Sequence, residues 1–115
     1  ALHESLLILK EEGLENARAR HNEMSQKLRN GFNDMGIKYL VDEACALPQL
    51  NTIIIPDHIT DEAAIRTKLL NDHNLEIGAG LGALAGKVWR VGLMGHSACD
   101  ENINKCLSAF KAVMN

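Results

Sequence analysis

The chain has 115 residues, of which 46% are hydrophobic, 23% are charged and 3% are aromatic. This length predicts one domain that buries roughly 65% of its unfolded surface, so a real core is expected. The formal charge is −3, from 12 Lys and Arg residues against 15 Asp and Glu residues. Without a basic surface to neutralise phosphates, and with its few aromatics scattered, the chain is not expected to bind nucleic acid.

The cysteine count and the lengths of the apolar segments indicate in which cellular compartment the protein is found. Three cysteines are an odd number in a chain large enough to fold without disulfides, which is typical of a reducing environment. No uncharged apolar stretch approaches the roughly 18 residues of a membrane span, and the first residues lack the charged head of a signal peptide. The final Val-Met-Asn is not a peroxisomal signal of the Ser-Lys-Leu type. We therefore expect a cytoplasmic protein without a membrane partner.

The first third of the chain has the pattern of amphipathic helices. Apolar residues recur at spacings of three and four over residues 2–35. Gly13 interrupts this pattern, and an interior glycine costs a helix about 1 kcal/mol relative to alanine. Two helices, Leu2–Glu12 and Leu14–Met35, are therefore predicted, with Gly36 as the carboxy-terminal cap of the second. Because the first residue already lies in a helical pattern and is not Met, we expect processing or a longer parent chain.

Two strands and a third helix are predicted in the middle of the chain. The β-rich segments Ile37–Val41 and Asn51–Ile55 are separated by a loop that contains Pro48. Thr60, followed by two acidic residues, is the expected amino-terminal cap of a helix that runs to about Asn71.

The remaining segments complete an α+β pattern. A short strand is predicted at Leu75–Gly78, a Gly/Ala-rich loop at Gly80–Gly86 and a longer strand at Val88–Leu93. The four residues from Ser97 to Asp100 have capping-box spacing before a final amphipathic helix. This order favours a two-layer α+β sandwich in which the helices pack on one face of a small, mostly antiparallel sheet.

The Gly/Ala-rich loop is similar to a dinucleotide-binding pattern without its context. The run Gly80–Ala85 fits G-x-G-x-x-A after a strand. That fingerprint requires a full helix after the glycines, whose first turn holds the pyrophosphate, whereas Gly86 and a strand follow here. We interpret the run as a loop that approaches another backbone closely, where a Cβ atom would clash.

The histidines and cysteines do not predict a metal site or a nucleophile. Only His96 and Cys99 have the spacing of half a metal site, and zinc needs three or four ligands. Cys99 and Cys106 are expected to be small apolar fillers near the last helix. A nucleophilic thiol would need an adjacent base or a positive field, which the sequence does not offer.

Arg90 is the most informative polar residue. Its neighbours within Val88–Leu93 are apolar residues or glycine, so its guanidinium is expected to be at least partly desolvated. One interpretation is an edge-strand arginine that reaches solvent or pairs with an internal carboxylate. The other is a planar fork that binds the carboxylate of a ligand through two hydrogen bonds. Lys87 is the nearest rival, but at the exit of the loop it is expected to be solvated.

A family resemblance rests on three segments. The string GAGLGALAGKVWRVGLMGHSA, residues 78–98, resembles the carboxy-terminal signature of the alanine–glyoxylate and serine–pyruvate (serine–glyoxylate) aminotransferases, class V pyridoxal-phosphate enzymes of fold type I. The string EEGLENARARH, residues 11–21, and residues 51–56 resemble the same family in the same order. The resemblance implies that residues 13–115 are the small carboxy-terminal domain and residues 1–12 a lead-in helix from the inter-domain linker. The large cofactor-binding domain would lie outside this sequence.

The resemblance also implies roles for particular residues. Arg90 matches the family's arginine that binds the α-carboxylate of the substrate. The Schiff-base lysine, the acid at the pyridine nitrogen and most phosphate ligands belong to the large domain, and no lysine here matches that lysine. Because small residues permit close approach, we expect the loop with Gly80, Leu81 and Gly82 to lie at the mouth of the active site.

The function implied is that of one part of an enzyme. The complete enzyme, a homodimer, would transfer an amino group from alanine or serine to glyoxylate or pyruvate, and the 115-residue chain alone would be inactive. The alternative is a stand-alone α+β binding or regulatory module that uses Arg90 to hold a small carboxylate without catalysis.

Overall fold

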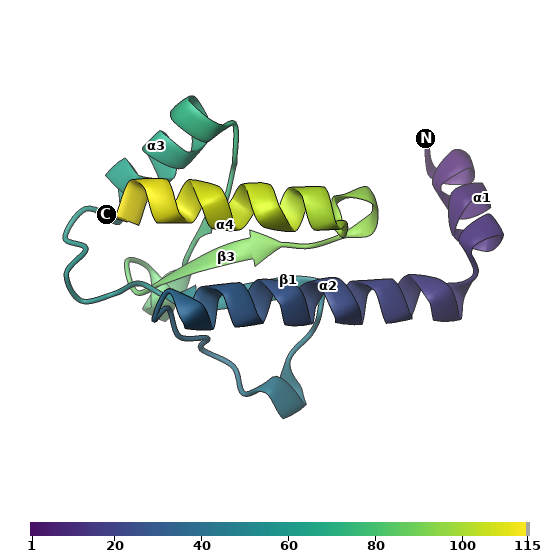
Figure 1. The fold of residues 1–115 in the computed structure, drawn as a ribbon, viewed down its shortest axis with the longest axis horizontal. Coiled ribbons are helices and arrows are strands. Elements are labelled where there is room, and N and C mark those ends of the chain that lie inside the picture. The colour runs from purple at the N-terminus through teal and green to yellow at the C-terminus, as the bar shows by residue number, and fades with distance from the viewer. Residues whose placement is uncertain (115) are drawn as a thin grey trace.

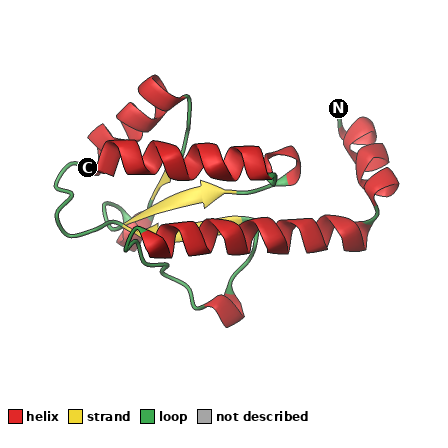
Figure 2. Ribbon diagram, in the orientation of Figure 1, coloured by secondary structure: helices red, strands yellow, loops and turns green. Residues whose placement is uncertain are grey.

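The computed structural model describes residues 1–114 and contains four helices and a three-stranded sheet in that range (Figures 1 and 2). In chain order the elements are α1 (Leu2–Glu12), α2 (Leu14–Asp34), β1 (Leu50–Ile54), α3 (Glu62–His73), β2 (Gly78–Ala79), β3 (Val88–Gly92) and α4 (Asp100–Met114). Single 3-10 turns, η1 (Glu43–Cys45), η2 (Gly82–Leu84) and η3 (Gly95–Ser97), lie in the connections. Within this range, no helix combines the length and the apolar character needed to cross a membrane.

The sheet has the order β1-β3-β2, and both pairings are antiparallel. Side chains alternate between its faces, so Trp89 and Val91 share one face while Arg90 lies on the other. Trp89 and Val91 belong to a buried cluster with residues of α2, α3 and α4. Helices α2 and α4 run side by side over the sheet in Figure 1. The predicted two-layer α+β fold, with its helices on one face, is confirmed.

The core between the layers is centred on three aromatic rings. Phe110 of α4 meets Phe32 of α2 edge to face with ring centroids 4.9 Å apart, and meets Trp89 of β3 at 5.9 Å. These three side chains are fully buried. Aromatic pairs in this geometry add about 0.5 to 1.5 kcal/mol each beyond the burial of their area. The core therefore fixes β3, and with it the direction in which Arg90 points.

The two expected glycine boundaries are present at the ends of α1 and α2. Gly13, with φ +85°, separates the helices as predicted. Gly36, with φ +74°, follows α2, and its N–H group donates to the carbonyl oxygen of Asn33. The N–H of Ile37 donates to the carbonyl of Phe32, which completes a Schellman motif.

The predicted strand at Ile37–Val41 is wrong in extent. Within residues 1–114 the segment forms one isolated bridge, Tyr39 to Ile53, made by the backbone groups of Lys38 and Leu40 on either side of Tyr39. The start of the segment closes the end of α2, and Asp42 then accepts the first hydrogen bond of the η1 turn. Too few residues remain between these two turns for a strand.

The predicted strand at Leu75–Gly78 is also displaced, because pairing with β3 begins only at Gly78 and ends at Ala79. Helix α3 runs to His73, past the expected end, and Asn74 adopts a left-handed conformation with φ +50°. The residues up to Ile77 are therefore used to return the chain to the sheet.

Two predicted helix caps are wrong. Asp61, not Thr60, caps α3, because its carboxylate accepts a hydrogen bond from the N–H of Ala64 at 2.9 Å. The Ser97 hydroxyl bonds the backbone of Met94 and so closes η3 instead of capping α4. Side-chain hydrogen bonds to the backbone compete locally, and spacing alone does not decide between neighbouring candidates.

Candidate carboxylate-binding site

Arg90 is half-buried on the face of the sheet opposite to the helices. Its Nε–H group donates to the carbonyl oxygen of Ala79 on the neighbouring strand at 2.8 Å. None of the ion pairs within residues 1–114 involves this guanidinium. Arg90 therefore lies on the central strand, not on an edge strand, and its hydrogen-bond partner is a carbonyl group.

The bond to Ala79 defines which edge of the guanidinium remains for a ligand. A guanidinium has five N–H donors in a rigid plane, and Nε uses one of them here. A Cβ atom built on Gly78 would lie 3.4 Å from Nη2 and 3.5 Å from Nε, so the guanidinium lies alongside β2. The edge formed by Nη1 and Nη2 is suited to two parallel hydrogen bonds with both oxygens of a carboxylate.

The surroundings of Arg90 on this face are small or apolar. Thr52 of β1 is directly opposite Arg90 in the register, and Gly78 is opposite it on β2. Leu50 and Ile54 lie on the same face of β1 and are exposed. A guanidinium beside exposed apolar side chains can bind a small organic anion whose carboxylate contacts Arg90.

The Gly/Ala-rich loop next to β2 confirms the expected close backbone approach at one position. Gly80 is buried, and a Cβ atom there would lie 2.0 Å from the carbonyl oxygen of Leu84. That contact is within the loop itself, whose η2 turn is closed by the Leu84 N–H bond to Leu81. Gly82 has φ +53°, and Leu81 is exposed. Only one 3-10 turn follows the glycines, so the helix of a dinucleotide fingerprint is absent from this described segment.

A polar contact that the sequence does not predict lies beneath the site, on the opposite face of β3. The Trp89 indole N–H donates to Glu62 Oε2 at 3.1 Å, and Arg66 binds both oxygens of that carboxylate. The hydrogen bonds from Arg66, with that from Trp89, hold the pKa of Glu62 below its usual value although burial opposes this. The indole is thus fixed to the start of α3. In the sequence, the i, i+4 spacing of Glu62 and Arg66 is the signal that could have indicated this ion pair.

The lowered pKa of Glu62 predicts a pH dependence of stability. A depressed carboxyl pKa contributes stability above the unfolded value, near 4.5, and this contribution is lost as the pH falls through the folded pKa. Glu62→Gln is expected to weaken the chain at pH 7 and to flatten the loss of stability below about pH 4.5. Urea unfolding of both proteins at neutral and acid pH measures this difference. Glu15→Gln, in an exposed pair with Arg18, is the control.

The thiols have distinct environments. Cys106 is buried, as expected of a filler, and burial raises its pKa to about 12, so it stays protonated. Cys99 is half-buried and Cys45 is exposed. Within residues 1–114 no group of three His, Cys, Asp or Glu side chains is arranged to hold a metal ion.

Known aminotransferases match this chain over almost its whole length, although no protein-family model matches it. The (S)-ureidoglycine–glyoxylate transaminase of Bacillus subtilis is 37% identical over 114 residues, which are 99% of this chain and 27% of that protein. The alanine–glyoxylate aminotransferase of Oryctolagus cuniculus is 35% identical over 99% of this chain and 29% of its own length. The crystal structure of alanine–glyoxylate aminotransferase from Nostoc sp. has a TM-score of 0.96 and 41% identity, covering 99% of this chain and 30% of that one.

These matches identify the class of protein to which the chain belongs. The fold and the strand that carries Arg90 occur in aminotransferases, and the chain spans less than a third of the length of the relatives it matches. The chain belongs to the class V aminotransferases, the family of the alanine–glyoxylate and ureidoglycine–glyoxylate enzymes, and corresponds to a carboxy-terminal portion of them. The resemblance seen in the sequence is confirmed.

Proposed function

We propose that this chain is the substrate-carboxylate-binding part of a pyridoxal-phosphate-dependent aminotransferase. The complete enzyme would transfer an amino group from a small amino acid, alanine or serine, to glyoxylate or pyruvate. The observation that carries the proposal is Arg90, whose Nε is held by Ala79 while the Nη1 and Nη2 edge has no carboxylate partner within residues 1–114. All these substrates have a carboxylate next to the reacting carbon, and several relatives are named for glyoxylate.

The role proposed for Arg90 is orientation of the substrate. Two parallel hydrogen bonds from a rigid fork fix the plane of a carboxylate, and so the direction of the bonds at the adjacent carbon. The hydrogen bond to Ala79 removes one degree of freedom from the fork before any ligand binds. Exact placement matters because a small displacement of reacting atoms costs a large factor in rate.

The cofactor does not fit the residues around Arg90. Gly78, Ala79, Thr52 and the apolar side chains of Leu50 and Ile54 lie around the guanidinium, and they offer neither an amine for the aldehyde of pyridoxal phosphate nor an acid for its ring nitrogen. We therefore place no cofactor-binding residue beside Arg90. Pyridoxal phosphate, which acts as the electron sink of transamination, would be held by the rest of the polypeptide.

The proposed domain boundaries follow the structure of the first helix. Residues 13–115 would form the small domain, and residues 1–12 would be the lead-in helix from the linker. This is supported by α1, which has no buried residue and is separated from α2 at Gly13. The large domain would make up most of the complete enzyme, a homodimer. Three free cysteines support a reducing, cytoplasmic location.

The experiment that tests the proposal compares the complete natural polypeptide with the 115-residue chain. The complete protein is expected to bind pyridoxal phosphate and to form glycine from glyoxylate with alanine or serine as donor. The chain alone is expected to show no transamination. A natural protein of only 115 residues that binds glyoxylate without turnover would contradict the proposal and favour a stand-alone binding module.

We further propose that Gly80, Leu81 and Gly82 lie at the mouth of the active site, and Gly82→Asn tests this. A Cβ atom on Gly82 meets no atom of residues 1–114 within 4 Å, and asparagine tolerates positive φ, so the chain is expected to lose no more than about 1 kcal/mol. In the complete enzyme kcat/KM is expected to fall about tenfold, because the new side chain occupies space at the mouth. Ala83→Asn is the control, and unchanged activity and substrate preference would show that the loop is merely a connection.

A further inference from the structure

Helix α1 is held to the rest of the chain at an elbow. It has no buried residue and stands apart at the amino-terminal end of α2 in Figure 1. At the elbow, Glu12 of α1 forms a two-pronged ion pair with Arg20 of α2, Oε1 to Nε at 2.6 Å and Oε2 to Nη2 at 2.8 Å. The hydrogen bonds from Arg20 hold the pKa of Glu12 below its usual value.

The same arginine also binds the turn that follows β3. Arg20 Nη1 donates to the carbonyl oxygens of Gly95 and Ala98, both at 2.8 Å. The adjacent His21 accepts a hydrogen bond from the Gly95 N–H at Nε2, 3.0 Å away, and its Nδ1 is 2.6 Å from the Ala17 carbonyl. Both backbone groups of Gly95 are therefore held by side chains of α2. Arg20 uses all three of its nitrogens in this junction.

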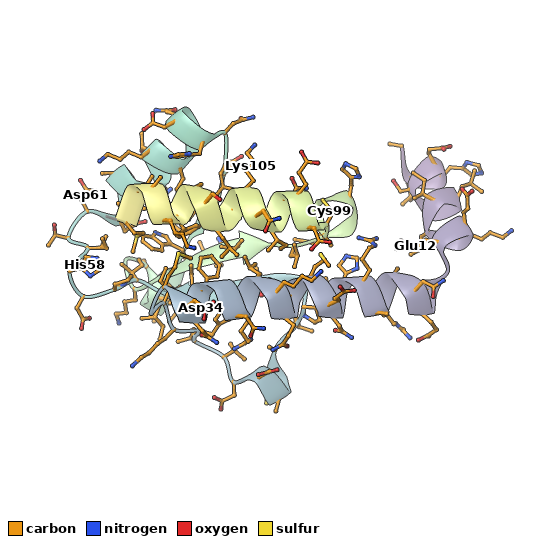
Figure 3. The ribbon with its side chains drawn as sticks, viewed as in Figure 1. Glu12, Asp34, His58, Asp61, Cys99 and Lys105 are labelled. Atoms are coloured by element: carbon orange, nitrogen blue, oxygen red, sulfur yellow. The ribbon has the colours of Figure 1, made fainter. Side chains whose placement is uncertain are left out.

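The side chains of α1 do not pack closely against the η3 turn, so the hydrogen bonds of Arg20 are not backed by a filled core. Between α1, the start of α2 and η3 lies a mainly apolar groove of about 980 Å³, with Ile8 and Leu9 on one wall and Ala98 and Cys99 on the other. Figure 3 shows Glu12 at the base of α1 and Cys99 at the start of α4, on either side of this junction. Because a groove, not a filled core, separates the two walls, the direction of α1 depends on the Gly13 backbone and on polar contacts at the elbow. One is the hydrogen bond from Asn16 Nδ2 to the Glu12 carbonyl at 2.8 Å, and the others are those of Arg20, which alone also reach the η3 turn.

We propose that Arg20 is a positioning residue that joins α1, α2 and the η3 turn into one rigid unit. The direction of α1 is thereby coupled to the end of β3, the strand that carries Arg90. The consequence for the reaction rests on the proposed function: α1 would transmit the placement of the preceding domain to the carboxylate-binding arginine.

The rigidity is measured on the chain itself with two spin labels, introduced by His3→Cys on α1 and Lys111→Cys on α4 in a background that carries Cys45→Ser and Cys99→Ser. Pulsed electron–electron double resonance is expected to give a narrow distribution of the distance between the two labels. This distribution is expected to become about twofold wider in Glu12→Gln and in Arg20→Ala, because the motion of α1 about the elbow is released. Glu12→Gln leaves the Arg20 bonds to the η3 turn in place, so it remains informative even if Arg20→Ala fails to fold.

Arg18→Ala is the matched control, because Arg18 lies two residues away on the same helix and, among the residues that the structure describes, its ion pair is with Glu15 on the exposed surface. It is expected to leave the distribution narrow. Distributions of equal width in the parent, Glu12→Gln and Arg20→Ala would overturn the proposal.

In the complete enzyme, Arg20→Ala is expected to lower kcat/KM about tenfold. Arg18→Ala is expected to keep the kcat/KM of the parent enzyme. A wider distribution with unchanged kcat/KM would overturn the positioning role. The proposed function is tested separately through Arg90, so the failure of one is distinguishable from the failure of the other.

Discussion

Replacing Arg90 by alanine in the complete enzyme is expected to lower kcat/KM for the amino acid and for the 2-oxo acid together. Both substrates present a carboxylate, and truncating one partner of a desolvated charge pair costs about 2 to 5 kcal/mol, or roughly thirtyfold to a few thousandfold. The loss is expected mainly as a raised KM. Steady-state kinetics with the donor and the acceptor varied in turn measure the effect.

Two further variants make the Arg90 result specific. Lys87→Ala, which removes an exposed charge three residues away, is expected to retain the parent kcat/KM. Arg90→Lys keeps the charge but loses the fork, and its activity is expected between those of the parent and the alanine variant. If kcat/KM is unchanged in Arg90→Ala, Arg90 does not bind the substrate carboxylate.

Replacing Trp89 by alanine is expected to have the largest effect on the stability of the chain. The indole is fully buried against Phe110, and truncating a buried tryptophan to alanine costs about 3 to 5 kcal/mol. The total stability of a domain is only about 5 to 15 kcal/mol, so this one substitution is expected to remove a large fraction of it. Urea unfolding followed by far-ultraviolet circular dichroism measures the change.

Trp89→Phe separates the packing of this residue from its hydrogen bond. Phenylalanine keeps a ring near Phe110 but cannot donate to Glu62, and the expected cost is about 1 to 2 kcal/mol. A cost below about 1 kcal/mol for the alanine variant would contradict the account of the core, because the cavity would then have closed without penalty.

The sequence predicted the helices well because their signals are local. The apolar stripe, the interruption at Gly13 and the stop at Gly36 act within a few residues of each other, and the helices begin and end within a few residues of the predicted bounds. The strand containing Arg90 was also predicted, because apolar residues surround a single charge there.

The strands at the edges of the sheet were predicted less well, since their extent depends on distant segments. Ile37–Val41 has a β-rich composition, yet the turns on both sides leave room for one isolated bridge, Tyr39 to Ile53. β2 is limited to Gly78 and Ala79 by the length of chain that α3 uses. Periodicity and propensity do not report either constraint.

The candidate site was predicted in its chemistry but not in its geometry. The sequence identified Arg90 as a partly desolvated guanidinium, whereas its bond to the Ala79 carbonyl depends on which strand lies beside β3. The junction at Arg20 had no signal at all, because its partners Gly95 and Ala98 lie 75 and 78 residues further along the chain.

A crystal structure of the complete enzyme with glyoxylate or an amino-acid substrate bound shows directly whether Arg90 binds the substrate carboxylate. Both carboxylate oxygens are expected at about 2.7 to 2.9 Å from Nη1 and Nη2 of Arg90, with Nε still bound to the Ala79 carbonyl. A substrate carboxylate held by other residues, with Arg90 unchanged and its Nη edge in solvent, would contradict the binding role proposed for Arg90.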